Sequence, residues 1–151
     1  MCSDPIFPQA NEVRPAPRSI VLDTNIVLDL LVFTDAGTQP LELALAARQV
    51  EWLATPAMRD ELERVLGYPP IASRLGRNQL SAAQVLLQFD SRSHRVDVAP
   101  AARLRCSDPD DQKFIDLAVA HQARLLSKDR AVLRVARRLQ IFESIGGLIG
   151  V

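Results

Sequence analysis

The chain of 151 residues has few of the features that mark several classes of protein. It contains two cysteines, Cys2 and Cys106, which are too few for a disulfide framework, and we expect both to be reduced thiols in a cytoplasmic protein. No apolar run is long enough to span a bilayer, because Asp29 and Asp35 interrupt the best candidate. The amino terminus lacks the basic and then apolar pattern of a secretory signal. These absences predict a cytoplasmic protein that makes no contact with a membrane.

Net charge and aromatic residues are also scarce. The 18 basic and 18 acidic residues give a formal charge of zero, whereas nucleic-acid binders are commonly basic overall. An acidic pocket ringed by basic residues would give the same sum, so composition leaves the partner open. With five Phe, one Trp and one Tyr, base stacking is not expected to dominate any binding of nucleic acid.

The residues that are present predict one folded domain. A hydrophobic fraction of 48% is typical of an ordered globular chain, and 151 residues suffice for one core. Residues 1–18 carry four prolines and no periodic pattern, so we interpret them as a loosely ordered leader. Residues 19–151 form the predicted domain.

Short apolar runs alternate with helical patterns along this domain. Strands are predicted at residues 19–22, 50–54, 95–98 and 124–127, with an edge strand at 141–142. Helices are predicted at residues 26–31, 40–49, 55–66, in two pieces between 71 and 89 that break near Gly76, and at 108–121 and 130–139. This alternation predicts an α/β fold, a three-layer α/β/α domain with a mainly parallel sheet and right-handed crossovers.

Acidic residues follow the predicted strands or begin the predicted helices. Asp23 ends the first strand and Asp129 closely follows the fourth, while Glu61 and the Asp110-Asp111 pair lie near helix starts. Ligands of open parallel sheets bind beyond the carboxyl ends of the strands. Four separate segments are therefore predicted to bring a carboxylate to one edge of the sheet.

Helical geometry separates the acids that face inward from their neighbours. At about 100° per residue, Glu61 lies at the edge of the buried face, while Asp60 and Glu63 point to solvent. In the later helix, Asp111 lies beside the buried face and Asp116 lies on the far side. The same geometry places His121 on that buried face, which favours a packed core residue over a metal ligand.

Each acid also has a purely structural interpretation. The Asp110-Asp111 pair could simply complement a helix dipole, Asp129 could be a helix N-cap, and Glu61 could be a solvated helix residue. Asp23 is the hardest to explain in this way, because a charge that ends a buried strand needs partners. Carboxylates without clustered His or Cys favour Mg²⁺ or Mn²⁺ over zinc.

Four motifs containing these acids occur in the order found in one known family. They are Ile20-Val21-Leu22-Asp23-Thr24-Asn25, Thr55-Pro56 through Asp60-Glu61-Leu62 to Val65-Leu66, Asp108-Pro109-Asp110-Asp111 before Lys113-Phe114 and Ala118, and Leu125-Leu126-Ser127-Lys128-Asp129. In these motifs the chain resembles the PIN-domain family over about residues 19–142. Each motif alone is weak, and the four in this order are fairly specific. The Asp-Pro-Asp-Asp variant is similar to the VapC-like branch, described as toxins of toxin–antitoxin systems.

The resemblance implies a set of site residues. The catalytic and metal-binding acids would be Asp23, Glu61, Asp111 and Asp129, supported by Thr24, Asn25, Asp110 and Ser127. The family carries Thr more often where Ser127 stands, and both offer a hydroxyl. The choice between Asp110 and Asp111 is open, although the spacing to Asp129 and the helical angle favour Asp111.

The activity implied is an endoribonuclease that uses Mg²⁺ or Mn²⁺. One or two ions would activate a water for in-line attack on an RNA phosphodiester. The resemblance further implies a cognate antitoxin protein and a homodimer. An alternative is a non-catalytic PIN scaffold that acts by binding RNA or protein. Its mark would be the loss of an acid, and all four are present.

Basic residues provide candidates for holding RNA. Arg130 and Arg134 fall on the face of the last predicted helix that is opposite its apolar side, with Lys113 and Lys128 nearby in the sequence. Such a face could bind phosphates, although a solvated surface is the commoner explanation.

Other phosphate-handling folds fit less well. A haloacid-dehalogenase-like phosphatase would need Asp-x-Asp after the first strand, where this chain has Asp23-Thr24-Asn25. A receiver domain would need an acidic pair before that strand, and a dinucleotide-binding domain a Gly-rich first turn. None of these patterns is present.

Overall fold

A parallel sheet forms the centre of the computed structural model, which describes residues 17–103 and 105–128. Its strands are β1 (Arg18–Leu22), β2 (Val50–Ala54), β3 (Ser93–Arg95) and β4 (Arg124–Leu126). They are ordered β3-β2-β1-β4, and all three pairings are parallel. Every carboxyl end in the sheet therefore faces the same way, as predicted for the α/β fold.

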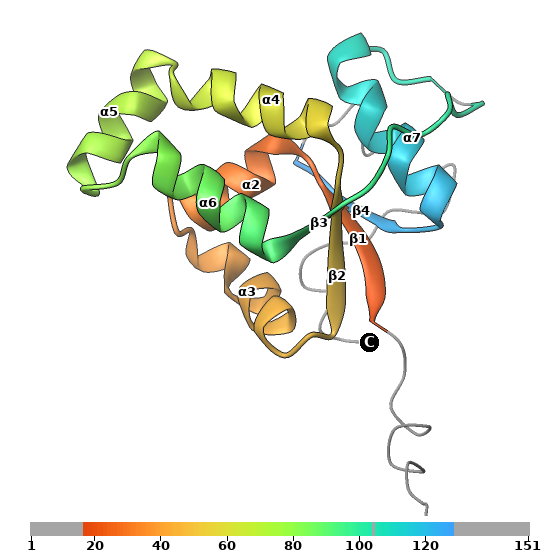
Figure 1. Cartoon of the computed structure of the whole chain (residues 1–151), viewed down its shortest axis with the longest axis horizontal. Coiled ribbons are helices and arrows are strands. Elements are labelled where there is room, and N and C mark those ends of the chain that lie inside the picture. Colours follow the sequence, from red (N-terminus) through yellow and green to blue (C-terminus); the bar gives the residue numbers. More distant parts are fainter. Residues whose placement is uncertain (1–16, 104, 129–151) are drawn as a thin grey trace, which may run out of the picture.

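Helices cover both faces of this sheet. They are α2 (Thr24–Leu31), α3 (Gln39–Ala46), α4 (Pro56–Leu66), α5 (Pro69–Arg77), α6 (Ala82–Arg92) and α7 (Gln112–His121), with short 3₁₀ helices η1 (Ala36–Thr38) and η2 (Pro109–Asp111). In Figure 1, α2, α3 and α6 lie on one side of the sheet and α7 lies on the other. The predicted three-layer arrangement is confirmed.

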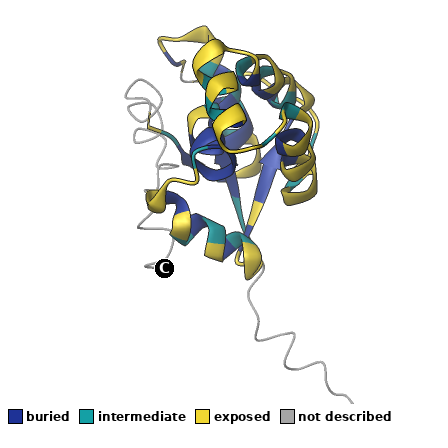
Figure 2. Ribbon diagram, turned by 90° about the vertical axis from the view of Figure 1, so that its left-hand side faces the viewer, coloured by how far each residue is buried: buried dark blue, intermediate teal, exposed yellow. Residues whose placement is uncertain are grey.

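The core lies between these layers, and strands β1, β2 and β4 are mostly buried within it (Figure 2). Ile20 and Val21 of the central strand have no exposed surface, because β1 is covered on both faces. Trp52 of β2 meets Phe89 of α6 edge-on, with ring centroids 5.0 Å apart. Cys106 is a free, buried thiol. In the part of the chain that the structure describes, no helix is long and apolar enough to cross a membrane.

Polar caps set the helix starts. The side chain of Thr55 accepts a hydrogen bond from the backbone N–H of Met58, and Pro56 occupies the first helical position, as predicted. Ser81 and Gln84 form a capping box at the start of α6. The predicted break near Gly76 is confirmed: α5 ends at Arg77, one residue later, and α6 begins at Ala82. Gly76 itself stays within α5, because a helical glycine costs only about 1 kcal/mol.

The third strand was predicted two residues too late. β3 spans Ser93–Arg95 and pairs with Trp52–Ala54, whereas the prediction was 95–98. The reason is that β2 ends at Ala54, and the last hydrogen bond to it comes from the N–H of Val96. Beyond that point the chain has no strand to pair with, and Val98 is exposed.

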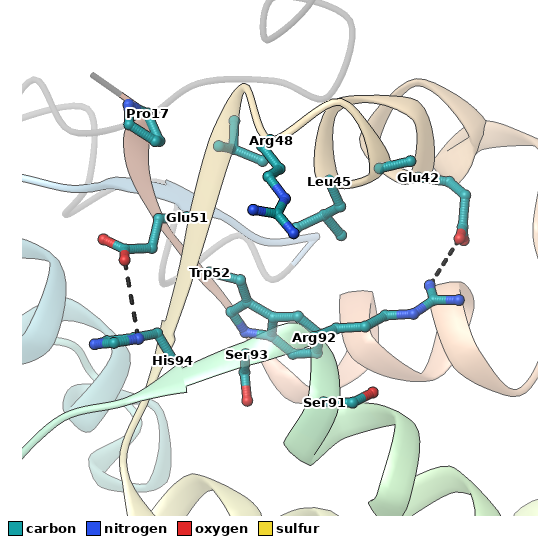
Figure 3. Close-up of a pocket in the computed structure, with 12 residues that line it drawn as sticks. Pro17, Glu42, Leu45, Arg48, Glu51, Trp52, Ser91, Arg92, Ser93 and His94 are labelled. Atoms are coloured by element: carbon teal, nitrogen blue, oxygen red, sulfur yellow. Dashed lines mark hydrogen bonds and ion pairs between the residues drawn. The ribbon is translucent and has the colours of Figure 1, made fainter.

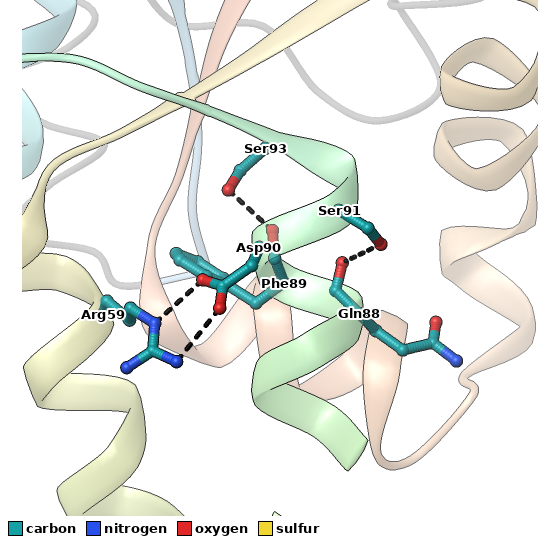
Figure 4. Close-up of polar contacts among 6 residues, drawn as sticks. All are labelled: Arg59, Gln88, Phe89, Asp90, Ser91 and Ser93. Atoms are coloured by element: carbon teal, nitrogen blue, oxygen red, sulfur yellow. Dashed lines mark hydrogen bonds and ion pairs between the residues drawn. The ribbon is translucent and has the colours of Figure 1, made fainter. Parts of the chain in front are cut away.

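An ion pair joins two helices on one side of the sheet. Arg59 of α4 donates two hydrogen bonds to Asp90 of α6, at 2.8 and 3.0 Å (Figure 4). This guanidinium–carboxylate contact holds α4, which carries Glu61, against α6. The hydrogen bond from Arg59 lowers the pKa of Asp90 below its ordinary value.

Some predictions fall on residues that the structure does not describe. They are the leader over residues 1–16, Asp129, Arg130, Arg134, the helix at 130–139 and the edge strand at 141–142.

Candidate active site

The first acid, Asp23, is buried where β1 ends and α2 begins. Its backbone N–H donates to the carbonyl of Leu126 at 3.2 Å, which extends the pairing of β1 with β4. One carboxylate oxygen, Oδ1, accepts from the N–H of Ile26 at 3.0 Å and so caps α2. The other, Oδ2, accepts from the hydroxyl of Ser127, just after β4. Asp23 is thus held by two segments that are about one hundred residues apart in sequence.

The second acid, Glu61, comes from the middle of α4 and turns inward, as predicted. Its side chain is only 19% exposed. Its Oε2 accepts a hydrogen bond from Oγ1 of Thr24 at 2.6 Å. Since Thr24 is the neighbour of Asp23, this bond ties the two acids together. Asp60 and Glu63 are exposed, also as predicted.

The Asp110-Asp111 pair divides into an outer and an inner residue. Asp110 is exposed, and its backbone carbonyl accepts a bond from the ammonium of Lys113. Asp111 is partly buried at the start of α7, and its carboxylate makes no capping bond to that helix. The cap before Pro109 comes instead from Asp108, which accepts from the N–H of Asp110 at 3.0 Å. Capping therefore does not account for the position of Asp111.

Three of the predicted acids meet in one cavity of about 330 Å³ at the carboxyl end of β1. The lining residues are Asp23, Thr24, Asn25, Leu28, Glu61, Val65, Tyr68, Pro70, Ile71 and Asp111. None of the described residues in this lining is basic. We refer to this space as the acidic cavity. It gathers carboxylates from β1, α4 and η2, which the sequence separates widely.

Two lysines reach acids at or near this cavity. Lys113 of α7 forms an ion pair with Oε1 of Glu61. Lys128 lies 2.5 Å from Oδ2 of Asp29, in α2. The hydrogen bond with Asp29 raises the pKa of Lys128 above its ordinary value, and the negative charge of Asp23 adds to that rise against the opposing effect of burial. Both lysines were predicted only as RNA contacts.

Sequence reasoning missed Asp29. It was noted only for interrupting an apolar run, yet it is buried within α2. The available signal was its position among Leu28, Leu30 and Leu31, because a charge on a buried helix face needs a partner. That partner, Lys128, adjoins Ser127 and so helps to fix the end of β4 beside Asp23.

One other expectation about α7 needs correction, and Asp116 has contacts that were not predicted. His121 was predicted to pack in the core, but it is exposed at the last residue of the helix, where the buried face has already ended. Asp116 was predicted to lie on the far side of the helix. It does not face solvent freely, because it accepts from the N–H of Ala102 at 2.8 Å and from Gln112 at 2.9 Å. Asp116 thereby holds the loop before α7.

The donor chemistry of the acidic cavity suits a hard divalent cation. Carboxylate oxygens with nearby hydroxyls are the ligands that Mg²⁺ and Mn²⁺ prefer. Within residues 17–103 and 105–128, no three Asp, Glu, His or Cys side chains are already grouped as a metal site. Glu61 is instead held by Thr24 and by the ammonium of Lys113. The ammonium of Lys113 is thus a cation that already contacts Glu61 in this structure.

A second cavity, of about 510 Å³, lies near the amino ends of the strands. Figure 3 shows its ion pairs, Arg92 with Glu42 at 2.7 Å and His94 with Glu51 at 3.9 Å. We refer to this space as the amino-end cavity. None of the sequence-predicted site residues lines it.

Comparisons with known proteins agree with the fold. A complex named VapBC2, from Rickettsia felis, bound to a DNA fragment from its promoter, contains a chain with a TM-score of 0.57 and 14% identity; the match covers 83% of this chain and 98% of that chain. A PilT N-terminus domain protein from Sulfolobus solfataricus matches with a TM-score of 0.46 and 13% identity, covering 87% and 91%. No curated protein matches the chain.

The family comparison is more specific than these structural likenesses. The model of the PIN domain matches residues 19–131, which is most of the chain and includes all four motifs that contain the predicted acids. The chain therefore belongs to the PIN-domain family.

Proposed function

We propose that the protein is a Mg²⁺- or Mn²⁺-dependent endoribonuclease and the toxin of a toxin–antitoxin pair. The observation that carries this proposal is the convergence of Asp23, Glu61 and Asp111 in one cavity. PIN domains are generally nucleases that use divalent metals. Membership of the family therefore supports a nuclease, and the acids supply the residues for it.

In this proposal the acids hold the metal and one another. Asp23, Glu61 and Asp111 provide the ligands, with Asp129 as the fourth acid by resemblance to the family. When bound, a divalent ion supplies Lewis acidity toward the scissile phosphate and lowers the pKa of a water that attacks in line. Ser127 orients the carboxylate of Asp23 through its hydroxyl. Thr24 does the same for Glu61, at 2.6 Å.

The lysines balance the negative charge of the site. Lys113 contacts Glu61 and lies at the edge of the acids, where its ammonium group can also meet an RNA phosphate. Lys128 is held by Asp29, on the side of β4. Arg130 and Arg134 remain predicted RNA contacts. Without such cations, the acids would repel the RNA backbone.

The partner is proposed from likeness alone. The VapBC2 structure has this fold, and the sequence motifs resemble VapC-like toxins. We propose accordingly that a cognate antitoxin binds the chain and that two copies form a homodimer in the cytoplasm. The antitoxin would keep the nuclease inactive until it is removed.

The test is cleavage of labelled single-stranded and structured RNAs by the wild type and by Asp23→Asn, with Mg²⁺, Mn²⁺ or EDTA. Asparagine is as good an N-cap as aspartate, so the start of α2 is retained while a charged ligand is lost. Asp97→Asn, at an exposed position after β3, is the matched control. We expect metal-dependent cleavage by the wild type and the control, and loss of at least about a hundredfold in Asp23→Asn, because even outer-shell partners of a metal cost 10- to 100-fold.

Calorimetry with Mn²⁺ separates the possible failures. A folded wild type that binds Mn²⁺ but cuts no RNA would point to a different substrate or to a missing partner. A wild type that neither binds Mn²⁺ nor cuts RNA would overturn the proposal. The non-catalytic scaffold would then be the better interpretation.

A further inference from the structure

The acidic cavity has an apolar wall as well as its acids. Besides the polar residues, it is lined by Leu28 of α2, Val65 of α4, and Tyr68, Pro70 and Ile71 at the junction of α4 and α5. A metal site alone needs no such surface, because hard cations are held by oxygen. Leu28 is buried, and Val65 and Ile71 pack against the core, whereas Tyr68 is exposed and can meet a second ligand group beside the phosphate.

We propose that this wall binds the base of an unpaired nucleotide next to the scissile phosphate, with Tyr68 as the residue that stacks on it. The inference rests on the proposed function, since the acids must bring a phosphate to the same cavity. It adds a residue that contacts the substrate: Tyr68 would stack on one unpaired base beside the cut site, with no strong preference for which base it is.

Exposure sets Tyr68 apart from other apolar residues at the surface. In the described part of the chain, the exposed large hydrophobic side chains are Leu43 at 59%, Tyr68 at 54%, Leu87 at 68% and Val98 at 73%. Single exposed hydrophobic residues are common and need no explanation. Of these four, however, only Tyr68 lines the acidic cavity. It is also the one tyrosine of the whole chain.

The backbone holds Tyr68 in place. Its N–H donates to the carbonyl of Val65 at 3.0 Å, and its own carbonyl accepts from the N–H of Ala72 at 2.8 Å. Two prolines, Pro69 and Pro70, follow at once and restrict the chain further. An aromatic group on a fixed backbone loses little entropy when a ligand stacks on it. Tyr68 is therefore suited to binding a flat ring.

The chemistry of the wall favours an unpaired base. Bases inside an A-form helix are stacked on one another, whereas those in loops and single strands can turn out and stack on aromatic side chains. A cavity of about 330 Å³ is near the lower end of the range for small-molecule sites, roughly 300–1,000 Å³. A volume of this size suits the base of one nucleotide.

The same wall offers little that would distinguish one base from another. Val65, Pro70 and Ile71 have no polar side-chain atoms, so the phenol of Tyr68 is the one polar group on this part of the lining. Stacking tolerates every base, because each has a π face. We therefore expect all four bases to be accepted at this position, and an abasic nucleotide to be rejected.

Binding of a fluorescein-labelled single-stranded RNA tests the inference, measured by anisotropy with Ca²⁺ as the cation. We compare wild type, Tyr68→Ala, Tyr68→Phe and, as the matched control, Leu87→Ala on α6. Tyr68→Ala is expected to weaken binding about tenfold, within the effect of removing a stacking aromatic residue. Tyr68→Phe keeps the ring and is expected to bind like the wild type, as is Leu87→Ala.

A second arm uses the same RNA with one abasic nucleotide beside the mapped cut, or at each position in turn if no cut is seen. The abasic RNA should bind the wild type about tenfold more weakly at one position, and Tyr68→Ala should lose nothing further there. Wild type that binds and cuts RNA, with Tyr68→Ala binding equally well, would overturn the stacking site and leave the nuclease intact. Wild type that neither binds nor cuts RNA would overturn both. Equal binding of duplex and single-stranded RNA would also contradict the inference.

Discussion

The two cavities at opposite ends of the sheet differ in size and in charge. The amino-end cavity is the larger, at about 510 Å³ against about 330 Å³. Its acids have basic partners in the same lining: Glu42 meets Arg92 at 2.7 Å, and Glu51 meets His94 at 3.9 Å. These contacts are partly exposed and join neighbouring elements. The amino-end cavity therefore resembles an ordinary junction between α3, β2 and β3.

The acidic cavity is smaller and its lining is acidic, although the ammonium of Lys113, which is not part of the lining, pairs with Glu61. Asp23, Glu61 and Asp111 line it without a basic residue among the described lining. Gathering like charges in a partly buried space costs free energy unless a cation is bound. The ammonium of Lys113 is such a cation for Glu61, and the proposed divalent ion would act in the same way on all three acids. The charge of the lining, rather than its volume, therefore distinguishes the acidic cavity from the amino-end cavity.

The largest expected difference between the two cavities is in the rate of RNA cleavage after one acid is removed from each. Glu61→Gln should lower the rate of metal-dependent RNA cleavage by at least about a hundredfold, because it removes a ligand charge while keeping the size of the side chain. Glu51→Gln, in the amino-end cavity, should change that rate less than about twofold, since its partner His94 is exposed. Cleavage rates at saturating Mn²⁺ measure both.

The control for this pair is Glu63→Gln, two residues from Glu61 in α4 and exposed. It should cut RNA like the wild type. If Glu51→Gln abolished cleavage while Glu61→Gln did not, the larger cavity would be the active one. The acidic cavity would then be the ordinary junction between elements.

Most of the fold could be predicted from local signals in the sequence. The strand at Val50–Ala54 and the helix from Pro56 to Leu66 were predicted at their observed bounds, because an apolar run, a cap and a glycine mark them. The third strand was predicted two residues too late, because its bounds depend on where β2 ends. Such pairing is a property of the sheet and leaves no local signal.

The predictions for the candidate site also divide into those made from local signals and contacts between distant elements that were missed. The convergence of Asp23, Glu61 and Asp111 was predicted from strand ends and helical angles, and they line one cavity. The contact of Lys113 with Glu61 could not be predicted, because it joins α7 to α4 across 52 positions of sequence. The pair of Asp29 with Lys128 was missed for the same reason. Periodicity shows which face a residue is on, but not which residue of another element it meets.

A smaller effect distinguishes the ion pairs near the two ends. Asp29 is buried and pairs with Lys128 at 2.5 Å. Asp29→Asn removes the charged partner of Lys128, whose ammonium is 56% exposed and can be solvated by water, so it should lower the free energy of unfolding by about 1 kcal/mol. Glu42→Gln, which breaks the exposed pair with Arg92, should cost less than about 0.5 kcal/mol. Urea unfolding at neutral pH measures both.

The variant Lys128→Gln and the double variant with Asp29→Asn complete a cycle that isolates the interaction between the two residues. A coupling free energy near zero would mean that burial of Asp29, rather than its ion pair, sets the cost. Equal losses of unfolding free energy in Asp29→Asn and Glu42→Gln would show that the ion pairs near the two ends of the sheet contribute equally to stability. Neither result would bear on cleavage.

The smallest effect concerns the pair of Arg59 with Asp90, which lines neither of the two cavities and gives a baseline for an ordinary exposed contact. The hydrogen bond from Arg59 lowers the pKa of Asp90 in the folded protein, so the folded state favours the ionised carboxyl. That stability is fully present above the ordinary pKa of Asp, about 3.9, and is lost as pH falls through the lower folded pKa. Asp90→Asn should therefore cost about 0.5 kcal/mol of unfolding free energy at pH 7 and pH 5, and nothing once Asp90 is protonated in the wild type. Urea unfolding from pH 7 to pH 2 measures the difference, and 1 M salt should reduce it because both groups are partly exposed. A difference that stayed constant down to pH 2 would show that Asp90 acts through packing of α4 on α6 and not through its charge.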